Sequence, residues 1–95
     1  MIGKYVICRT YSAGVFMGKL TKMKKKCATL ENARRLWKWS GAASLSQLSV
    51  DGVKNPEDCK FPCSVEKVLL TEVIEIIPVT DRAKKSIDGV KVWEM

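Results

Sequence analysis

Apolar and polar positions along the chain divide its first third into short segments with the spacing of strands. Residues 4–10, KYVICRT, are rich in β-branched and aromatic side chains, which favours a mostly buried strand. Residues 15–23, VFMGKLTKM, form a second such segment, and Gly18 inside it indicates a bulge or the close approach of another backbone. Turn-forming residues 11–14 separate the two segments, so we expect them to pair as a meander.

Two longer segments complete the predicted sheet. Residues 27–39, CATLENARRLWKW, predict a third strand, with a bulge or tight turn at Asn32-Ala33. Residues 64–79 form the longest apolar stretch, with apolar side chains at both alternating sets of positions. Their Val and Ile content favours a single strand that is buried on both faces over a helix. Pro78 is expected to end it, because proline has no N–H for the ladder.

A short helix is predicted at about residues 40–50. Ser44 followed by Gln47 has the S-x-x-Q spacing of a capping box, and Ser40 is an alternative cap one turn earlier. Gly52 is expected to end this helix, because glycine readily adopts the backbone conformation that follows a last turn.

The remaining segments complete the predicted fold. Residues 53–63 contain two prolines and predict a loop, residues 80–88 a second helix capped by Thr80-Asp81, and residues 90–95 a last short strand. The fold class is therefore α+β: a small antiparallel, partly open β-barrel of the SH3-like or OB-like kind with one or two short helices. We expect one domain over residues 1–95. A chain this short buries a small share of its surface, so we also expect a homo-oligomer.

Positive charge is concentrated in the first part of the chain. Residues 1–40 carry ten Lys and Arg and one acid, a net +9, whereas residues 41–95 carry seven Lys and Arg and nine acids, a net −2; the sum is +7. Such a one-sided field attracts nucleotides, nucleic acid or acidic protein surfaces. The lysines at 22–26, taken alone, are more typical of a solvated hairpin turn.

The residue inventory argues against catalysis and against metal binding. The chain has no histidine, the commonest general base and metal ligand. Its four cysteines lack the paired short spacings of common zinc modules, and no P-loop or dinucleotide fingerprint is present. We expect a protein that is not an enzyme and needs no cofactor.

Location is predicted from the absence of targeting features. No apolar run approaches the ~20 residues that cross a bilayer, and the N-terminus does not have the pattern of a signal peptide. We therefore expect a cytoplasmic protein with free thiols and no membrane partner.

The stretch ARRLWKWSGAASLSQL, residues 33–48, is the strongest candidate binding segment. In an extended chain Arg35, Trp37 and Trp39 would share one face, where a nucleobase stacks on indole and guanidinium binds phosphate. The small residues that follow would leave backbone N–H groups free for an anion at a helix start. The candidate ligand-binding residues here are Arg34, Arg35, Trp37, Trp39, Ser40, Gly41, Ser44 and Gln47.

Structural alternatives remain open for these residues. A tryptophan of a small domain often belongs to its core. Arg34 and Arg35 would have only a structural role if they paired with Glu72 or Glu75. Arg9 and Tyr11 are a second candidate site at the end of the first strand, where side chains line a barrel mouth; the alternative is an exposed strand end.

Residues 6–20, VICRTYSAGVFMGKL, and 32–53, NARRLWKWSGAASLSQLSVDGV, resemble small proteins encoded by tailed bacteriophages and prophages. The pattern runs V-x-R-T-x-S-A-G-V-F-x-G-x-L and then N-A-R-R-L-W-x-W-x-G-A-A-S-L. This resemblance implies a role in the host bacterial cytoplasm. It suggests a non-catalytic anti-defence sponge that sequesters a phosphate-bearing nucleotide, such as an immune signal.

Three functions therefore stand as hypotheses. The first is the binding of a phosphate-bearing small nucleotide, and the second is a nucleic-acid-binding small barrel. The third is a protein–protein inhibitor of a host enzyme, because Trp and Arg are also common interface residues.

Overall fold

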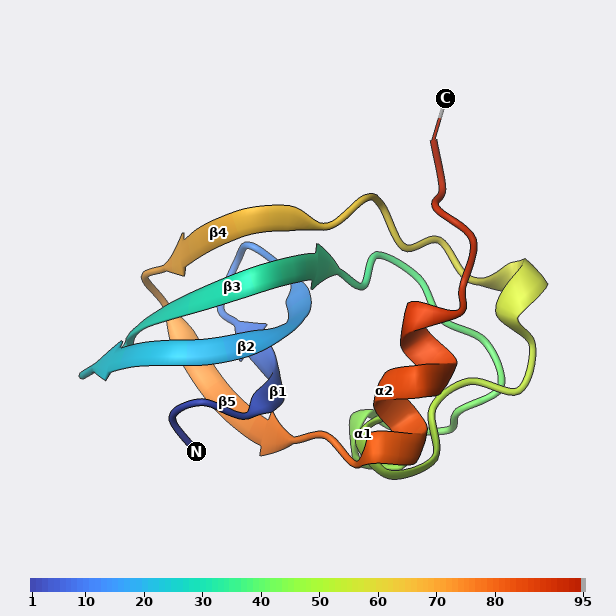
Figure 1. Ribbon diagram of the computed structural model, residues 1–95, viewed down its shortest axis with the longest axis horizontal. Helices are drawn as coiled ribbons and strands as arrows, with labels where there is room; N and C mark the ends of the chain where they lie inside the picture. Colours follow the sequence, from blue (N-terminus) through green and yellow to red (C-terminus); the bar gives the residue numbers. More distant parts are fainter. Residues whose placement is uncertain (95) are drawn as a thin grey trace.

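The computed structural model describes residues 1–94 and contains a five-stranded antiparallel sheet (Figure 1). The sheet order is β4-β3-β2-β1-β5. The edge strand β4 pairs with β3, and the edge strand β5 pairs with β1. Because the two edge strands do not pair with each other, the curled sheet is not closed. The predicted α+β fold, a small and partly open antiparallel barrel, is confirmed. The strands are β1 (Tyr5–Thr10), β2 (Val15–Lys24), β3 (Cys27–Arg35), β4 (Val65–Leu70) and β5 (Val73–Pro78).

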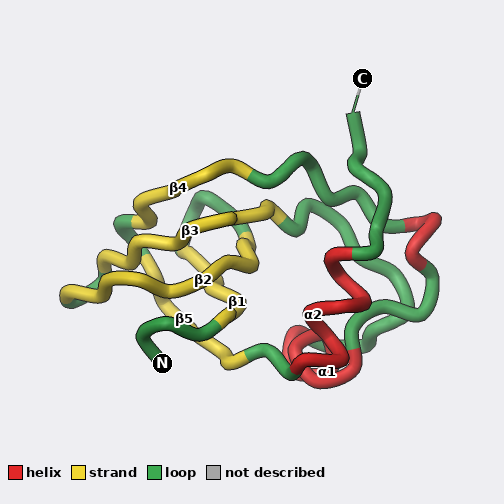
Figure 2. Tube along the Cα trace, in the orientation of Figure 1, coloured by secondary structure: helices red, strands yellow, loops and turns green. Residues whose placement is uncertain are grey.

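The helices lie together at one end of the sheet (Figure 2). They are α1 (Leu45–Asp51), the 3-10 turn η1 (Pro56–Asp58) and α2 (Asp81–Asp88). Both α-helices were predicted, with α1 shorter than expected at its N-terminal end. Over the described residues, no helix is both long and apolar enough to cross a membrane.

Two apolar clusters pack on opposite faces of β1 and β2. The inner cluster fills the curled sheet and includes Val6 and Phe16, whereas the outer cluster includes Ile7 and Met17. Alternate residues of both strands thus point into different cores. The outer cluster places the helices and the loop before β4 against the sheet, and its other members include Leu36, Leu48, Phe61, Ile87 and Val90.

The predicted bulge at Asn32-Ala33 is present in β3. Lys19 pairs with Glu31 and Met17 with Arg34, so that Asn32 and Ala33 together face the single residue Gly18. A Cβ atom on Gly18 would lie 3.0 Å from the Cβ of Leu30 and 3.2 Å from the Cα of Ala33. The two backbones therefore approach as closely at Gly18 as the glycine led us to expect. The extra residue of the bulge also shifts the alternation of side chains in β3, so Arg34 faces the outer core.

The expectation of one continuous strand over residues 64–79 is wrong. The chain bends at Thr71-Glu72, and β5 crosses to the far edge of the sheet beside β1. The bend is held because the N–H of Tyr11 donates to the carbonyl of Glu72 at 2.9 Å, and that of Val73 to the carbonyl of Lys26 at 2.9 Å. It also reverses the alternation of faces, so Val73 is buried while Ile74 is exposed.

The third and last predicted strands also differ from the structure. β3 ends at Arg35 rather than at residue 39, although Lys38 forms an isolated antiparallel bridge with Lys60. Of the predicted strand over residues 90–95, Val92 forms one parallel bridge with Phe61, and Met95 lies outside the described residues. Three extended segments, residues 37–38, 60–61 and 92–93, therefore lie side by side beyond the end of β3.

Candidate functional site

Arg34 is a core residue rather than a surface one. Its side chain is 5% exposed, and its guanidinium donates hydrogen bonds to four backbone carbonyls at 2.7–3.1 Å. Burial lowers the pKa of this guanidinium, although arginine keeps its charge in proteins. The structure thus gives Arg34 a structural role in place of the predicted contact with a ligand. The four acceptors are Phe61, Pro62, Ile87 and Val90.

A second bulge separates the two tryptophans of the candidate segment. The N–H groups of Trp37 and Lys38 both donate to the carbonyl of Lys60, each at 3.2 Å. Two residues thus face one across this bridge, and the alternation of faces is interrupted. Trp37 is 65% exposed, whereas Trp39 packs partly buried against the outer core. The prediction that Arg35, Trp37 and Trp39 share one face is therefore wrong for Trp39.

Ser40 and Gly41 fix the chain between this bulge and α1. The N–H of Ser40 donates to the Sγ of Cys59 at 3.4 Å, and the Ser40 hydroxyl accepts from Asn55 at 3.3 Å. Gly41 has φ +89°, and a Cβ there would lie 2.5 Å from the backbone nitrogen of Lys54. Both residues therefore hold two loops together.

Ser44 and Gln47 form the start of α1. The Ser44 hydroxyl accepts from the N–H of Gln47 at 3.1 Å, and the Gln47 side chain accepts from the N–H of Ala43 at 2.7 Å. This arrangement confirms the predicted cap, with the glutamine reaching one residue further back than in a standard capping box. Two of the N–H groups expected to bind an anion are thus already satisfied within the chain.

Arg35 and Tyr11 lie exposed at the same end of the sheet. The Arg35 guanidinium stacks over the Phe16 ring at 4.6 Å, and the side chain remains exposed. Tyr11, in the turn between β1 and β2, is 77% exposed. Arg9 instead pairs with Glu75, its Nε atom 2.9 Å from a carboxylate oxygen. The alternative pairing of Arg34 or Arg35 with Glu72 or Glu75 is not observed.

Sequence reasoning missed Lys60, which lies beside Trp37, and Trp93, which lies on the other side of the segment that carries Lys60. The Lys60 ammonium lies 5.4 Å from the centre of the Trp93 ring, and the N–H of Trp93 donates to the carbonyl of Phe61 at 3.0 Å. Phe61 is fully buried, so Lys60, its neighbour in an extended segment, points away from the core. The available signal was a tryptophan flanked by charges, in the segment KVWEM.

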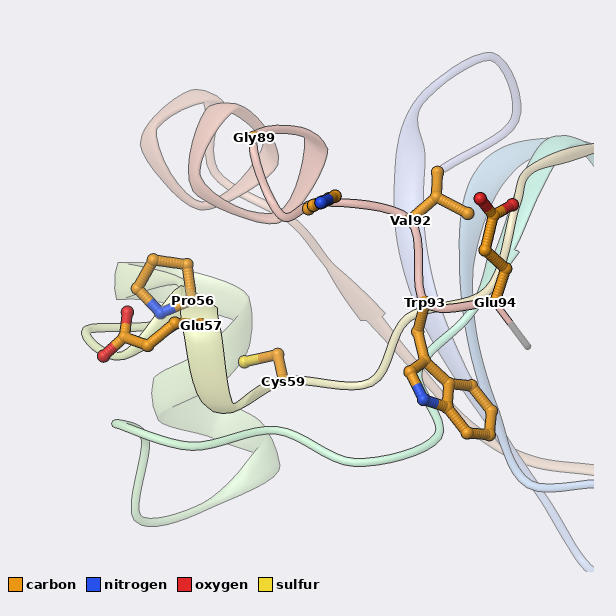
Figure 3. Close-up of a pocket in the computed structure, with 8 residues that line it drawn as sticks. Pro56, Glu57, Cys59, Gly89, Val92, Trp93 and Glu94 are labelled. Carbon is orange, nitrogen blue, oxygen red and sulfur yellow. The ribbon is translucent and has the colours of Figure 1, made fainter.

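A pocket of about 580 Å³ lies beside Trp93, between η1 and the C-terminal segment. Figure 3 shows the Trp93 indole on the opposite side of this segment from the side chains of Val92 and Glu94. Cys59, which directly follows the 3-10 turn, also lines the pocket (Figure 3). The pocket is lined by Pro56, Glu57, Cys59, Gly89, Lys91, Val92, Trp93 and Glu94.

Together these residues form one solvent-facing patch. We name it the Trp37–Trp93 surface and define it by five residues from the end of β3 and the two adjoining segments: Arg35, Trp37, Lys38, Lys60 and Trp93. Its two indoles offer flat apolar faces, and its three cations offer N–H donors without a carboxylate bound to any of them among the described residues. This combination suits a ligand with an aromatic ring and an anionic group.

The described part of the chain gathers no three His, Cys, Asp or Glu side chains that could hold a metal ion. Its cysteines are free thiols in the structure. Burial raises the pKa of the Cys8 thiol to about 11, so it stays protonated at neutral pH. Cys8 is therefore an inner-core side chain.

Comparison with known proteins gives one result. A family model described as "Domain of unknown function (DUF6948)" matches residues 3–87, which include all but one of the residues of the Trp37–Trp93 surface. No curated protein and no solved structure matches the chain.

Proposed function

The chain belongs to the DUF6948 family, a domain of unknown function, and we therefore propose its role from its surface: it is a non-catalytic protein that binds a phosphate-bearing nucleotide. The proposed site is the Trp37–Trp93 surface. The nucleobase stacks on an exposed indole, and Lys60 and Lys38 contact the phosphate.

The observation that carries this proposal is the position of Lys60 between the two exposed tryptophans. Its ammonium lies 5.4 Å from the Trp93 ring, and its carbonyl accepts from the N–H of Trp37 at 3.2 Å. A base stacked on an aromatic side chain contributes about 1–3 kcal/mol, and a lysine beside it binds phosphate as a point charge. Trp37 is 65% exposed, so a base that covers its indole removes apolar surface from water, which is favourable.

Binding without turnover would hold the nucleotide out of solution. The sequence contains no histidine to act as general base, and the resemblance to phage proteins suggests sequestration in the bacterial cytoplasm. Base and phosphate are shared by free nucleotides, cyclic dinucleotides and nucleic acid strands. The first experiment therefore tests the shared chemistry.

The test titrates AMP, ATP and a cyclic dinucleotide into the protein, with intrinsic tryptophan fluorescence and thermal unfolding as readouts. Binding should quench fluorescence and raise the melting temperature, because a ligand of the folded state stabilises it. Trp93→Ala should weaken binding roughly 5- to 150-fold, the equivalent of one stacked base. Lys60→Ala should weaken nucleotide binding more at low salt than at high salt, because salt screens the charge that the variant removes.

Lys24→Ala is the matched control, because Lys24 lies at the end of β2 that is remote from this surface. It removes the same charge and should leave nucleotide affinity nearly unchanged. If none of the three ligands changes fluorescence or melting temperature at millimolar concentration, the proposed function is wrong.

A further inference from the structure

We infer that the ligand is a single-stranded nucleic acid; this inference rests on the proposed function and names the ligand class of the same site. Two features of the structure carry it. The surface has two stacking platforms where a mononucleotide needs one, and two further lysines lie on the adjoining strands β2 and β4.

The two platforms lie on either side of one lysine. Residues 37–38 adjoin Lys60 through three backbone hydrogen bonds, and residues 92–93 adjoin Phe61 on the other side. Two successive bases of a strand can therefore stack on Trp37 and Trp93, with the phosphate that joins them over Lys60. In a duplex the bases are stacked on each other and paired, so their faces are not free for this contact.

Two lysines lie on the outer face of the sheet, Lys19 on β2 and Lys67 on β4, with Glu31 of β3 between them. Lys19 and Lys67 are the residues directly opposite Glu31 on the two neighbouring strands, so the three side chains form one row across the sheet. Lys19 shares a face with Met17, two residues before it, and Met17 belongs to the outer core that Phe61 covers. The row therefore lies on the face toward which Phe61 points, whereas Lys60 points away from it. Because β4 is an edge strand, a flexible strand can pass around this open edge from Lys60 to the row.

A groove of about 430 Å³ follows this row. Thr21 and Thr29 line it with hydroxyl groups, Lys22 and Lys67 with ammonium groups, and Leu69, 62% exposed, with an apolar side chain. A phosphate–sugar backbone presents oxygens to such donors without reading sequence. Glu31 is the one acid that lines the groove.

β3 joins the two halves of this path. It begins directly after the lysines at 24–26 and ends at Arg35, two residues before Trp37; Figure 1 shows it running between these two regions. Its nine residues span roughly 30 Å at the usual rise per residue. A single nucleotide covers only one end of this path, whereas a strand of several nucleotides follows all of it.

The experiment measures the fluorescence anisotropy of labelled oligo-dT of 2, 4, 8 and 16 nucleotides, with AMP and a 16-base-pair duplex as comparisons. Affinity should rise with length to a plateau, and the duplex should bind more weakly than the strand of equal length. If three lysines contact phosphates, log affinity should fall with log salt with a slope of about −2.

Variants of the lysine row separate the strand from the single nucleotide. The double variant Lys19→Ala, Lys67→Ala should weaken the 16-mer about tenfold at moderate salt and leave AMP binding unchanged. Lys67→Arg, which keeps the charge, should retain the affinity of the 16-mer. Lys85→Ala, on α2, is the matched control for loss of an exposed lysine.

Each outcome decides a different statement. If AMP and the 16-mer bind with equal affinity and equal salt dependence, the strand inference is wrong and the proposed function stands. If the 16-mer binds but Trp37→Ala and Trp93→Ala leave its affinity unchanged, both are wrong, because no base stacks on either indole. If neither ligand binds, both are wrong as well.

Discussion

The Nη2 atom of Arg34 lies 2.7 Å from the carbonyl oxygen of Val90, a residue 56 positions later in the chain. The same guanidinium also binds the carbonyls of Phe61 and Ile87. One side chain at the end of β3 thus holds the segment that carries Lys60 and the segment that carries Trp93. The Trp37–Trp93 surface depends on this contact, although Arg34 is not exposed on it.

Replacing Arg34 should therefore destabilise the fold. In Arg34→Met four carbonyls lose a charged donor in a buried place, and we expect a loss of about 3 kcal/mol or more in the free energy of unfolding. Arg34→Lys keeps the charge but has too few donors for all four carbonyls, so its loss should be smaller. Urea denaturation measures both. Arg35→Lys is the control, since Arg35 is exposed and should change stability by less than about 0.5 kcal/mol.

A second prediction concerns Gly41, which sequence reasoning placed in a ligand site. In Gly41→Ala the new Cβ would lie 2.5 Å from the Lys54 nitrogen and 2.8 Å from that of Asn55, at a φ of +89°. The loops must separate, and we expect a loss of about 2–3 kcal/mol. Gly14→Ala is the matched control: its φ is +99°, with nothing within 4 Å of the added atom.

Gly14→Ala should cost only the unfavourable backbone conformation, about 1 kcal/mol. The difference between the two variants, measured by thermal and urea unfolding, then reports the steric clash alone. Equal losses at both positions would show that the loops at Gly41 have room for a side chain.

The sequence predicted the features that depend on neighbouring residues. The β-branched and aromatic content of residues 4–10 and the apolar residues of 15–23 indicated β1 and β2, because both faces of these strands are buried. The bulge at Asn32-Ala33 and the cap at Ser44 were also predicted, since both are local. Asn32 in fact has a positive φ of 50°.

The features that failed depend on residues far away in the chain. Trp37 and Trp39 have the same local pattern, but the bulge that separates them needs the carbonyl of Lys60. The break at Thr71-Glu72 needs the N–H of Tyr11, and the burial of Arg34 needs acceptors at least 27 positions distant. No periodicity within one segment carries this information.

A third prediction tests the cap of α1. Ser44→Ala removes the hydroxyl that accepts from the N–H of Gln47, and we expect a loss of about 1 kcal/mol. Ser46→Ala is the control, because the Ser46 side chain is exposed in the same helix and bonds through its backbone carbonyl only. Urea denaturation of both variants measures the difference. If nucleotide binding also falls in Ser44→Ala at a temperature where the protein is folded, the start of α1 belongs to the binding site.

A fourth prediction concerns the two cysteines at opposite extremes of burial. Cys8 is fully buried with a pKa of about 11, whereas Cys63 is exposed. Alkylation by iodoacetamide needs a thiolate that the reagent can reach. At pH 8 we therefore expect Cys63 to be modified within minutes and Cys8 to be modified only on unfolding, as peptide mass spectrometry would show.

The same pKa predicts how stability changes with pH. The folded-state pKa of Cys8 lies above the unfolded value of 9.0, so the unfolded chain loses this proton first as pH rises. The contribution of the protonated thiol is complete below pH 9 and is lost between pH 9 and about 11. Cys8→Ala should remove this part of the pH dependence of urea unfolding, while Cys63→Ala should leave it intact. An equal alkaline loss of stability in Cys8→Ala and the parent protein would assign the effect to other groups.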